Sequence, residues 1–432
     1  MIWEQLLDEL CTAVKYHDTL KLAVFLLKII EQQDMEEFEL EKTKLDFTLI
    51  QSSLEDAERG NKSHHGDDSS SEYFQQFFLI CMDLLVSLKL KNIDNQIKYE
   101  IDLINLLSKR LLDDPSFYLT PIIIVAKNLR RTVFKAHPPT DEIYSIDSQS
   151  NIIVDNFTNS IQRPFKLLIS NKSDNKINIS AIHIFASHLF SIYFKYNKLN
   201  AVINLYKVLS NTILSDTSTS NNRIDYTPLL NTQSIFDYFI GLALLIQSNY
   251  EKSYNYFKSS YENKHSKSFN LKILFYLLPL NYLISKKLPT NAFFEKFPDL
   301  KLLESLYKCV KMLDLNEYNV NLEKFKFILL KFKVFSIYIK FQTLIQSSIV
   351  KTTYEIYRQN LSLEELDKAH IVPISIFTTG MNVMRSSNIS PIRTDEATEC
   401  LLCRLIATGH IKGYLSHAKQ VIVLSKSVPF PQ

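Results

Sequence analysis

The sequence predicts a mainly α-helical protein, in which a TPR-like helical solenoid is followed by a C-terminal winged helix. Apolar residues recur three and four positions apart along most of the 432 residues, the period of amphipathic helices. Only 6 residues are glycine, against 28 phenylalanines and 22 tyrosines, so few positions suit tight hairpins, phosphate loops or strained catalytic turns. Near the C-terminus the pattern changes to short helices and two strand-like runs, which together indicate a winged helix.

The overall charge does not by itself indicate a nucleic-acid-binding protein. Lys and Arg total 49 and Asp and Glu total 46, a net charge of +3, so only local clusters of charge can indicate a polyanionic ligand. The five cysteines are an odd number spread over the chain, which is typical of reduced thiols in a cytosolic or nuclear protein. The start Met1-Ile2-Trp3-Glu4 does not resemble a signal peptide, and no apolar run reaches the length of a membrane span. We therefore expect a soluble protein without membrane contact.

The N-terminal part divides at a polar segment. Residues 1–55 carry apolar positions at helical spacing and predict two or three helices. Residues 56–72 contain one aliphatic residue and predict a disordered loop. The loop includes His64, His65, Asp67 and Asp68, which we interpret as solvating residues rather than a metal site.

Residues 73–233 predict a helical solenoid with polar linkers. Helical patterning from Tyr73 stops at His137-Pro138-Pro139, and a second polar segment lies near residues 210–232. Between these breaks, residues 163–208 predict a helical block.

Residues 234–352 predict a TPR-like subdomain. The positions that match a tetratricopeptide-type helix pair are Tyr238, Gly241, Tyr250, Ser253, Phe257 and Ser260. Small residues stand where two helices touch, and Phe257 fills the groove between them. A weaker copy at Ala201, Leu205 and Val208 suggests stacked hairpins.

One long helix is expected over residues 319–351, apolar on two faces. Lys326, Lys333 and Lys340 follow one seam at intervals of seven, and Lys324 and Lys331 follow the other. No acidic residue lies between Lys324 and Tyr354 to neutralise them. The lysines either extend from a buried helix to solvent or form a positive ridge for phosphate.

Residues 353–432 predict the winged helix. Short helices are expected over 353–360 and 362–369, an edge strand over 371–374, and a helix over 394–408 with Thr394 or Asp395 as its cap and Gly409 after its end. Strand-like runs over 411–415 and 420–425 are joined by a polar turn.

This combination resembles the PCI family of proteasome-lid, signalosome and initiation-factor subunits. The residues that carry the resemblance are Glu399-Cys400-Leu401-Leu402-Cys403-Arg404-Leu405-Ile406-Ala407-Thr408-Gly409-His410-Ile411-Lys412-Gly413-Tyr414-Leu415-Ser416-His417, Tyr193-Phe194-Lys195-Tyr196-Asn197-Lys198-Leu199 and Phe275-Tyr276-Leu277-Leu278-Pro279-Leu280. They are similar to the branch of the signalosome-associated subunit twelve and the PCI subunit of the nuclear-pore mRNA export complex. The resemblance covers roughly residues 118–432, and the first 115 residues resemble no family.

The resemblance implies a non-enzymatic scaffold. It implies pairing with a second PCI protein through the winged helix, binding of a small acidic disordered proteasome-lid subunit, and contact with RNA or DNA in mRNA processing, transcription elongation or export. It also implies a nuclear location, with the cytoplasm as a second compartment. The alternative is a purely structural assembly subunit of a signalosome-like complex, without nucleic-acid contact.

Specific residues are candidates for each contact. From Cys400 to the end the chain carries Arg404, Lys412, Lys419 and Lys426 and no acid, so with Lys326, Lys333 and Lys340 they are the nucleic-acid candidates. Ile411, Val421 and Val423 are expected to form an apolar ladder in an edge hairpin, which needs a partner. The candidates for the acidic chain are Lys264, Lys267, Lys272, Lys286 and Lys287.

No catalytic constellation is present in the sequence. There is no Walker A motif, nucleophile elbow or dinucleotide fingerprint. Cys400 and Cys403 lack a second ligand pair for zinc, and we expect them to face the core. His183 and His188 do not have zincin spacing and are expected in the core or a groove. We therefore expect no enzyme activity, no cofactor and no metal.

Overall fold

The computed structural model describes residues 2–31, 50, 52–54, 56–57, 69–138, 148–171, 176–212, 230–263, 267–362, 368–383 and 393–431. The chain divides into two compact units, Met1–Ala243 and Leu244–Gln432. Every helix among these described residues is too short or too polar to span a lipid bilayer.

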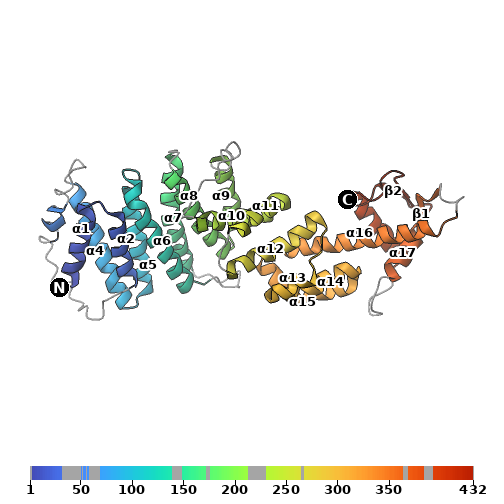
Figure 1. The fold of residues 1–432 in the computed structure, drawn as a ribbon, viewed down its shortest axis with the longest axis horizontal. Coiled ribbons are helices and arrows are strands. Elements are labelled where there is room, and N and C mark those ends of the chain that lie inside the picture. The colour runs from blue at the N-terminus through green and yellow to red at the C-terminus, as the bar shows by residue number, and fades with distance from the viewer. Residues whose placement is uncertain are drawn as a thin grey trace. The chain divides into compact units, whose positions relative to one another are not determined.

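The first unit is a stack of helical hairpins (Figure 1). Its helices are α1 (Ile2–Lys15), α2 (Thr19–Glu31), α4 (Ser69–Lys89), α5 (Ile93–Lys109), α6 (Pro115–Ala136), α7 (Ser148–Ser170), α8 (Lys176–Lys195), α9 (Leu199–Thr212) and most of α10 (Leu230–Ile246). From α1 to α9, neighbours in sequence pack against each other, and α6 also packs against α2 and α8. Large side chains such as Phe77, Phe117 and Phe185 fill the space between the layers. The predicted solenoid is confirmed.

Six helix-to-helix turns in the described chain share one geometry, although glycine fills none of them. One residue has positive φ, and the N–H of the next residue bonds to a carbonyl five positions earlier, which is a Schellman turn. The residues with positive φ are His17, Lys91, Asn197, Ser248, Leu313 and Lys333. In four turns the next residue is Asp18, Asn92, Asn249 or Asp314, whose side chain accepts a backbone N–H of the following helix. A single short turn therefore ends one helix and starts the next.

The boundaries of several predicted segments change in the structure. Ser69–Glu72 begin α4 instead of ending the predicted loop, and His64, His65, Asp67 and Asp68 lie outside the described residues. Helix α7 starts at Ser148, before the expected block, and its buried face begins at Val154.

The helical part of the second unit contains α11 (Tyr250–Glu262), α12 (Lys267–Ser285), α13 (Asn291–Lys296), the 3-10 helix η3 (Pro298–Leu303), α14 (Glu304–Met312), α15 (Leu315–Lys331) and α16 (Phe335–Gln359). Ser253, Phe257 and Ser260 are buried as expected, and Phe257 stacks on Tyr276 of α12 with ring centroids 5.0 Å apart. The weaker copy is incomplete, because Val208 is exposed.

The prediction of a single long helix over residues 319–351 is wrong. The chain turns at Phe332–Val334, where Lys333 has φ of 59°, and α15 and α16 pack against each other. Phe332 inserts towards α12, with its ring centroid 4.6 Å from that of Phe275. The apolar residues of the two faces therefore belong to two helices of one hairpin.

The winged helix consists of β1 (Ile371–Pro373), α17 (Ile374–Val383), α18 (Asp395–Ala407), β2 (Gly413–Ser416) and β3 (Val421–Leu424), packed on the end of α16. The strands form an antiparallel sheet in the order β1-β3-β2. Thr394 caps α18 by accepting the N–H of Ala397, and Gly409 follows with φ of 77°, as expected. Helix α17 was not expected, and residues 353–359 continue α16 rather than forming a separate helix. Most of the expected helix over 362–369 lies outside the described residues.

Candidate partner and nucleic-acid interface

The sheet of the winged helix has an apolar outer face. Val423 of β3 pairs directly with Ile371 of β1 on one side and with Tyr414 of β2 on the other, so these three side chains point to the same face. Ile371 is 39% exposed and Tyr414 is 63% exposed. On the opposite face, Ile422 and Leu424 are buried against the helices. We call the triad Ile371, Val423 and Tyr414 the wing face.

The prediction of an edge hairpin is wrong in one respect. Strand β3 is the central strand, so its backbone is paired on both sides and Val421 and Val423 do not lie on an edge. Both valines are half-buried on the outer side of the sheet. Ile411 is 2% exposed and belongs to the protein's own core. The exposed apolar surface of this sheet is therefore the wing face, and Ile411 is not part of it.

The four C-terminal basic residues do not line one edge. Lys412 precedes β2 and Lys426 follows β3, so both lie at the open end of this hairpin, where Ser425 N–H donates to Lys412 O at 2.8 Å. Lys419 lies in the turn at the other end. All three side chains are exposed.

Arg404 has a structural contact. Its guanidinium donates a hydrogen bond to Gln346 Oε1 of α16, which connects α18 to the helical subdomain. Burial, with a smaller effect of the nearby Arg404 charge, lowers the pKa of Arg393. Arg404 and Arg393 thus lie close together at the base of the winged helix.

Lys286, at the end of α12, approaches the open end of the hairpin. Burial, followed by the charge of Lys286, lowers the pKa of His410, two residues before Lys412. Lys286 Nζ donates to Leu283 O at 2.8 Å, and its side chain remains exposed. We therefore group Lys286 with Lys412 and Lys426 as the candidate basic site at this end. No pattern in the sequence indicates the place of Lys286, because it lies more than a hundred positions earlier in the chain.

Acidic side chains approach the other end of the wing. His417 Nδ1 lies 2.9 Å from Glu399 Oε1 of α18, and Asp395 and Glu396 occupy the first turn of the same helix. The Lys419 end is therefore of mixed charge, in contrast to the Lys412 end.

Lys326, Lys333 and Lys340 do not form a ridge. Lys326 pairs with Glu323 at 3.1 Å, a residue just before the acid-free segment. Lys333 occupies the turn between α15 and α16, and Lys340 Nζ lies 4.3 Å from the centroid of the Tyr250 ring. Part of the helix that was expected to be apolar on two faces is exposed: Phe327 is 83% exposed, and Val320, seven positions earlier, is 70% exposed.

The candidates for an acidic chain are partly accessible. Lys267 and Lys272 are exposed on α12, and Lys287 is exposed just after that helix. Lys264 lies outside the described residues.

The cysteine and histidine positions do not form a chemical site. Cys400 and Cys403 are exposed, contrary to expectation, because Thr398, Leu401, Leu402 and Leu405 form the buried face of α18. Burial lowers the pKa of His183 to about 4 and that of His188 to about 3, as expected for core histidines. Among the described residues no three His, Cys, Asp or Glu side chains gather as metal ligands.

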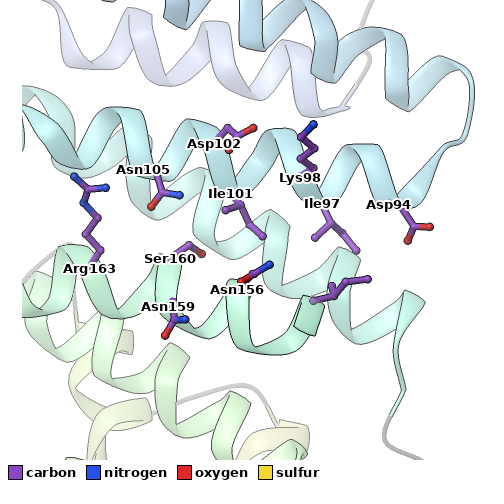
Figure 2. A pocket seen from close by; sticks show the side chains of 11 residues that line it. Asp94, Ile97, Lys98, Ile101, Asp102, Asn105, Asn156, Asn159, Ser160 and Arg163 are labelled. Carbon is purple, nitrogen blue, oxygen red and sulfur yellow. The ribbon is translucent and has the colours of Figure 1, made fainter. Parts of the chain in front are cut away.

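A pocket of about 490 Å³ lies between α5 and α7 (Figure 2). Asp94, Lys98 and Asp102 line it from α5, and Asn156, Ser160 and Arg163 line it from α7. Its charges are of mixed sign, and it contains neither a histidine nor a cysteine that would act as base or nucleophile.

Comparison with known proteins identifies the fold of the C-terminal part. The PCI domain profile matches residues 322–426. The chain is 30% identical to the Protein CSN12 homolog of Debaryomyces hansenii over 324 residues, covering 68% of this chain and 70% of that protein. It is 27% identical to PCI domain-containing protein 2 of Danio rerio, covering 60% of each chain, and 27% identical to the Drosophila melanogaster homolog of that protein, covering 57% of this chain and 56% of the relative. With its helical solenoid and terminal winged helix, the chain belongs to the PCI-domain family, in the branch of the CSN12 homologs and PCI domain-containing protein 2.

Proposed function

We propose that this chain is a non-enzymatic scaffold subunit that pairs with a second PCI protein through its winged helix and contacts RNA or single-stranded DNA. The observation that carries the proposal is the wing face, because Ile371 and Tyr414 expose apolar surface on either side of Val423. Exposed apolar surface of this kind is stabilised when a partner covers it.

The pairing has a simple test. Purification of the tagged full chain from native extract is expected to recover a second PCI-domain chain in equal amount. Ending the chain at Thr408, which removes β2 and β3, should abolish this recovery while the helical solenoid stays folded. Full recovery with the shortened chain would place the pairing surface elsewhere.

The proposed nucleic-acid contact is the basic site of Lys286, Lys412 and Lys426. Three exposed ammonium groups at one end of the hairpin attract phosphate without reading base sequence. Replacing Lys412 and Lys426 with glutamine should weaken binding of a labelled single-stranded RNA and reduce the dependence of affinity on salt. Lys419→Gln is the control, because Glu399 lies beside His417 at that end and makes its charge mixed. Unchanged affinity with intact pairing would favour a purely structural assembly subunit.

A small acidic disordered subunit is the proposed second partner. Lys267 and Lys272 on α12, with Lys287 after it, present exposed positive charge that an acidic chain can follow. Charge reversal at these three positions should release the acidic subunit but keep the second PCI protein. Retention of the acidic subunit at normal stoichiometry would contradict this assignment.

The proposed setting is a nuclear complex in mRNA processing, transcription elongation or export. This rests on the resemblance to the branch of the PCI family that includes an mRNA export subunit. Imaging of a fluorescently tagged chain should show nuclear accumulation, and RNA crosslinked to it in cells should be enriched in mRNA. Exclusion from the nucleus would contradict the proposal.

A further inference from the structure

Helix α6 in the first unit carries a concentrated positive charge. It contains Lys127, Arg130, Arg131 and Lys135 and no acidic residue, whereas the whole chain has a net charge of only +3. All four basic residues lie in the C-terminal half of the helix. Among the described residues, none of them forms an ion pair with a carboxylate.

Three of these residues form a regular exposed row. Lys127, Arg131 and Lys135 follow one another at intervals of four, which places them on one side of the helix about 6 Å apart along its axis. All three are exposed. We call them the α6 ladder. Their separation is comparable with that of successive phosphates along an extended single strand.

The neighbouring helix α8 extends the positive surface. Lys195 Nζ lies 5.3 Å from the centroid of the Phe134 ring, so it stands beside the ladder above a half-buried aromatic side chain. His188 lies beneath α6, and burial, followed by the charges of Arg130 and Lys127, keeps its pKa low. The buried imidazole therefore stays neutral and leaves the positive charge at the surface. Helix α8, like α6, contains no acidic residue.

The surface lacks the features that a protein partner needs. No large apolar side chain of the described α6 and α8 residues is among the exposed ones, so a protein would find no apolar anchor there. A nucleic-acid backbone needs only the charges, and Arg131 adds a guanidinium fork that suits phosphate. Phe134 and the cation above it offer a surface for a base.

We propose that the α6 ladder, with Lys195, is a second binding site for single-stranded RNA or DNA, separate from the winged helix. The site holds phosphates of the backbone and does not select sequence. It goes beyond the proposed function, because it assigns nucleic-acid contact to the first unit.

The test uses the full chain and a fluorescein-labelled oligouridylate of about twenty nucleotides, measured by fluorescence anisotropy over a range of salt. The ladder variant combines Lys127→Gln, Arg131→Gln and Lys135→Gln. The control variant combines Lys91→Gln, Lys109→Gln and Lys207→Gln, which removes the same charge from three scattered exposed positions. Circular dichroism melts check that both variants fold.

The ladder variant is expected to bind about tenfold more weakly at low salt, and the slope of log affinity against log salt should fall by about 2, since each phosphate contact contributes about 0.7. The control should change affinity less than twofold. Equal affinity of the two variants, or no binding by the unsubstituted chain, would overturn the proposal. If the ladder variant binds the oligouridylate normally but binds a labelled polyglutamate more weakly, the proposal is overturned and the surface binds an acidic protein instead.

The Lys412→Gln, Lys426→Gln variant separates this site from the winged helix. If the α6 ladder is an independent site, its substitutions weaken binding by the same factor in that background as in the unsubstituted chain. The ladder substitutions could weaken oligonucleotide binding while Lys412→Gln and Lys426→Gln leave it unchanged. That result would uphold this inference and contradict the nucleic-acid contact assigned to the winged helix.

Discussion

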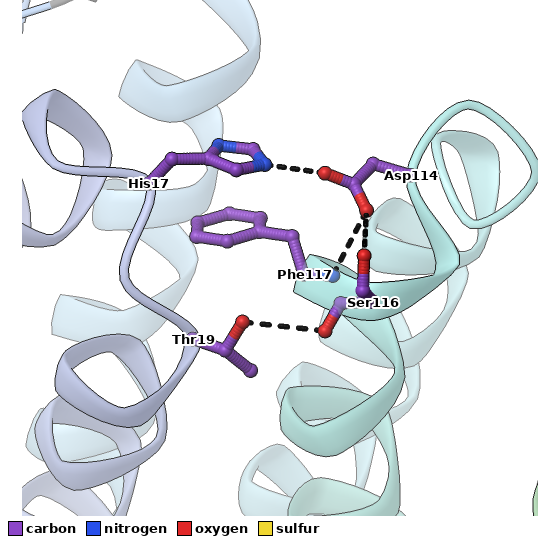
Figure 3. Close-up of polar contacts among 5 residues, drawn as sticks. All are labelled: His17, Thr19, Asp114, Ser116 and Phe117. Atoms are coloured by element: carbon purple, nitrogen blue, oxygen red, sulfur yellow. Dashed lines mark hydrogen bonds and ion pairs between the residues drawn. The ribbon is translucent and has the colours of Figure 1, made fainter. Parts of the chain in front are cut away.

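His17 and Asp114 join the first helical hairpin to the start of α6, across 97 positions of sequence (Figure 3). The Nε2 atom of His17 donates to the Asp114 carboxylate, while its ring stacks on Phe117 with centroids 4.2 Å apart. The same carboxylate caps α6 by accepting Phe117 N–H at 3.1 Å. A residue of the Schellman turn between α1 and α2 thus contacts the N-terminal cap of another helix, which fixes the packing of successive hairpins.

Replacing Asp114 with asparagine should therefore reduce stability. Burial alone would raise the pKa of Asp114, but hydrogen bonds from Ser116, His17 and Phe117 N–H outweigh it and hold the pKa below its usual range. The contribution of the carboxylate is present above its unfolded pKa and is lost as the pH falls through the lower folded value. Asp114→Asn should cost about 1 kcal/mol in urea unfolding at neutral pH, because it removes the charge from the hydrogen bonds that the carboxylate accepts, and less in acid. Asp113→Asn is the control, and equal loss from both would contradict the assignment.

Glu100 should make the first unit less stable as the pH rises. Burial raises its pKa to about 7, and only one carboxylate oxygen has partners, Gln96 Nε2 at 3.0 Å and Asn128 Nδ2 at 2.6 Å. The pKa of Glu100 is higher in the folded chain than in the unfolded chain, so its protonated form favours folding. This contribution to stability is fully present below the unfolded pKa of about 4 and is lost as the pH rises towards the folded value of about 7.

Glu100→Gln resembles the protonated side chain and removes this dependence. The variant should be more stable than the unsubstituted chain at pH 8, by an amount on the order of 2 kcal/mol, and similar at pH 4. Urea unfolding at the two pH values measures the difference. A variant that is destabilised equally at both would show that the carboxylate is needed in its ionised form.

Gly413 should be essential to the sheet of the winged helix. A Cβ atom there would lie 2.4 Å from the backbone carbonyl oxygen of Val423, which cannot move without separating β2 from β3. Gly413→Ala should destabilise the winged helix by about 2 kcal/mol or more. Gly409→Ala is the comparison, because a Cβ atom there would meet open space. This substitution should destabilise the protein by only about 1 kcal/mol, the cost of placing alanine at a φ of 77°. Equal thermal shifts for the two would contradict the close approach.

The turn at Lys333 predicts opposite results for two neighbouring substitutions in α15. Leu329 is fully buried and Phe327 is 83% exposed. Leu329→Asp should therefore unfold the subdomain, because it buries a charge, whereas Phe327→Asp should change the melting temperature little. Severe destabilisation by Phe327→Asp would support a buried stripe along one continuous helix.

Much of the fold is predictable because amphipathic helices have a strong period. Ser253, Phe257 and Ser260 lie three and four positions apart and form the buried face of α11, and Thr394 and Gly409 mark the ends of α18. The turn at Lys333 was missed because a lysine, rather than glycine or proline, adopts the left-handed conformation. His17, Lys91 and Leu313 also adopt this conformation without being glycine.

The candidate site was only partly predictable, because its geometry depends on contacts between distant segments. The place of β1 beside β3 makes β3 central, and no local pattern indicates that order. Lys286 reaches the Lys412 end through the packing of the second unit. Cys400 and Cys403 are exposed because four other residues of α18 already form its buried face.

Pairing through the wing face can be tested with one pair of substitutions. The full chain with Ile371→Asp and Tyr414→Asp is purified from native extract, and the recovered complex is measured by light scattering and mass spectrometry. The control carries Met312→Asp and Val383→Asp, two apolar residues that are also exposed but lie outside the wing face. We predict that the unsubstituted chain and the control retain a second PCI-domain chain at equal stoichiometry and that the wing-face variant, still folded, loses it. Retention of that chain by the folded wing-face variant would contradict the account.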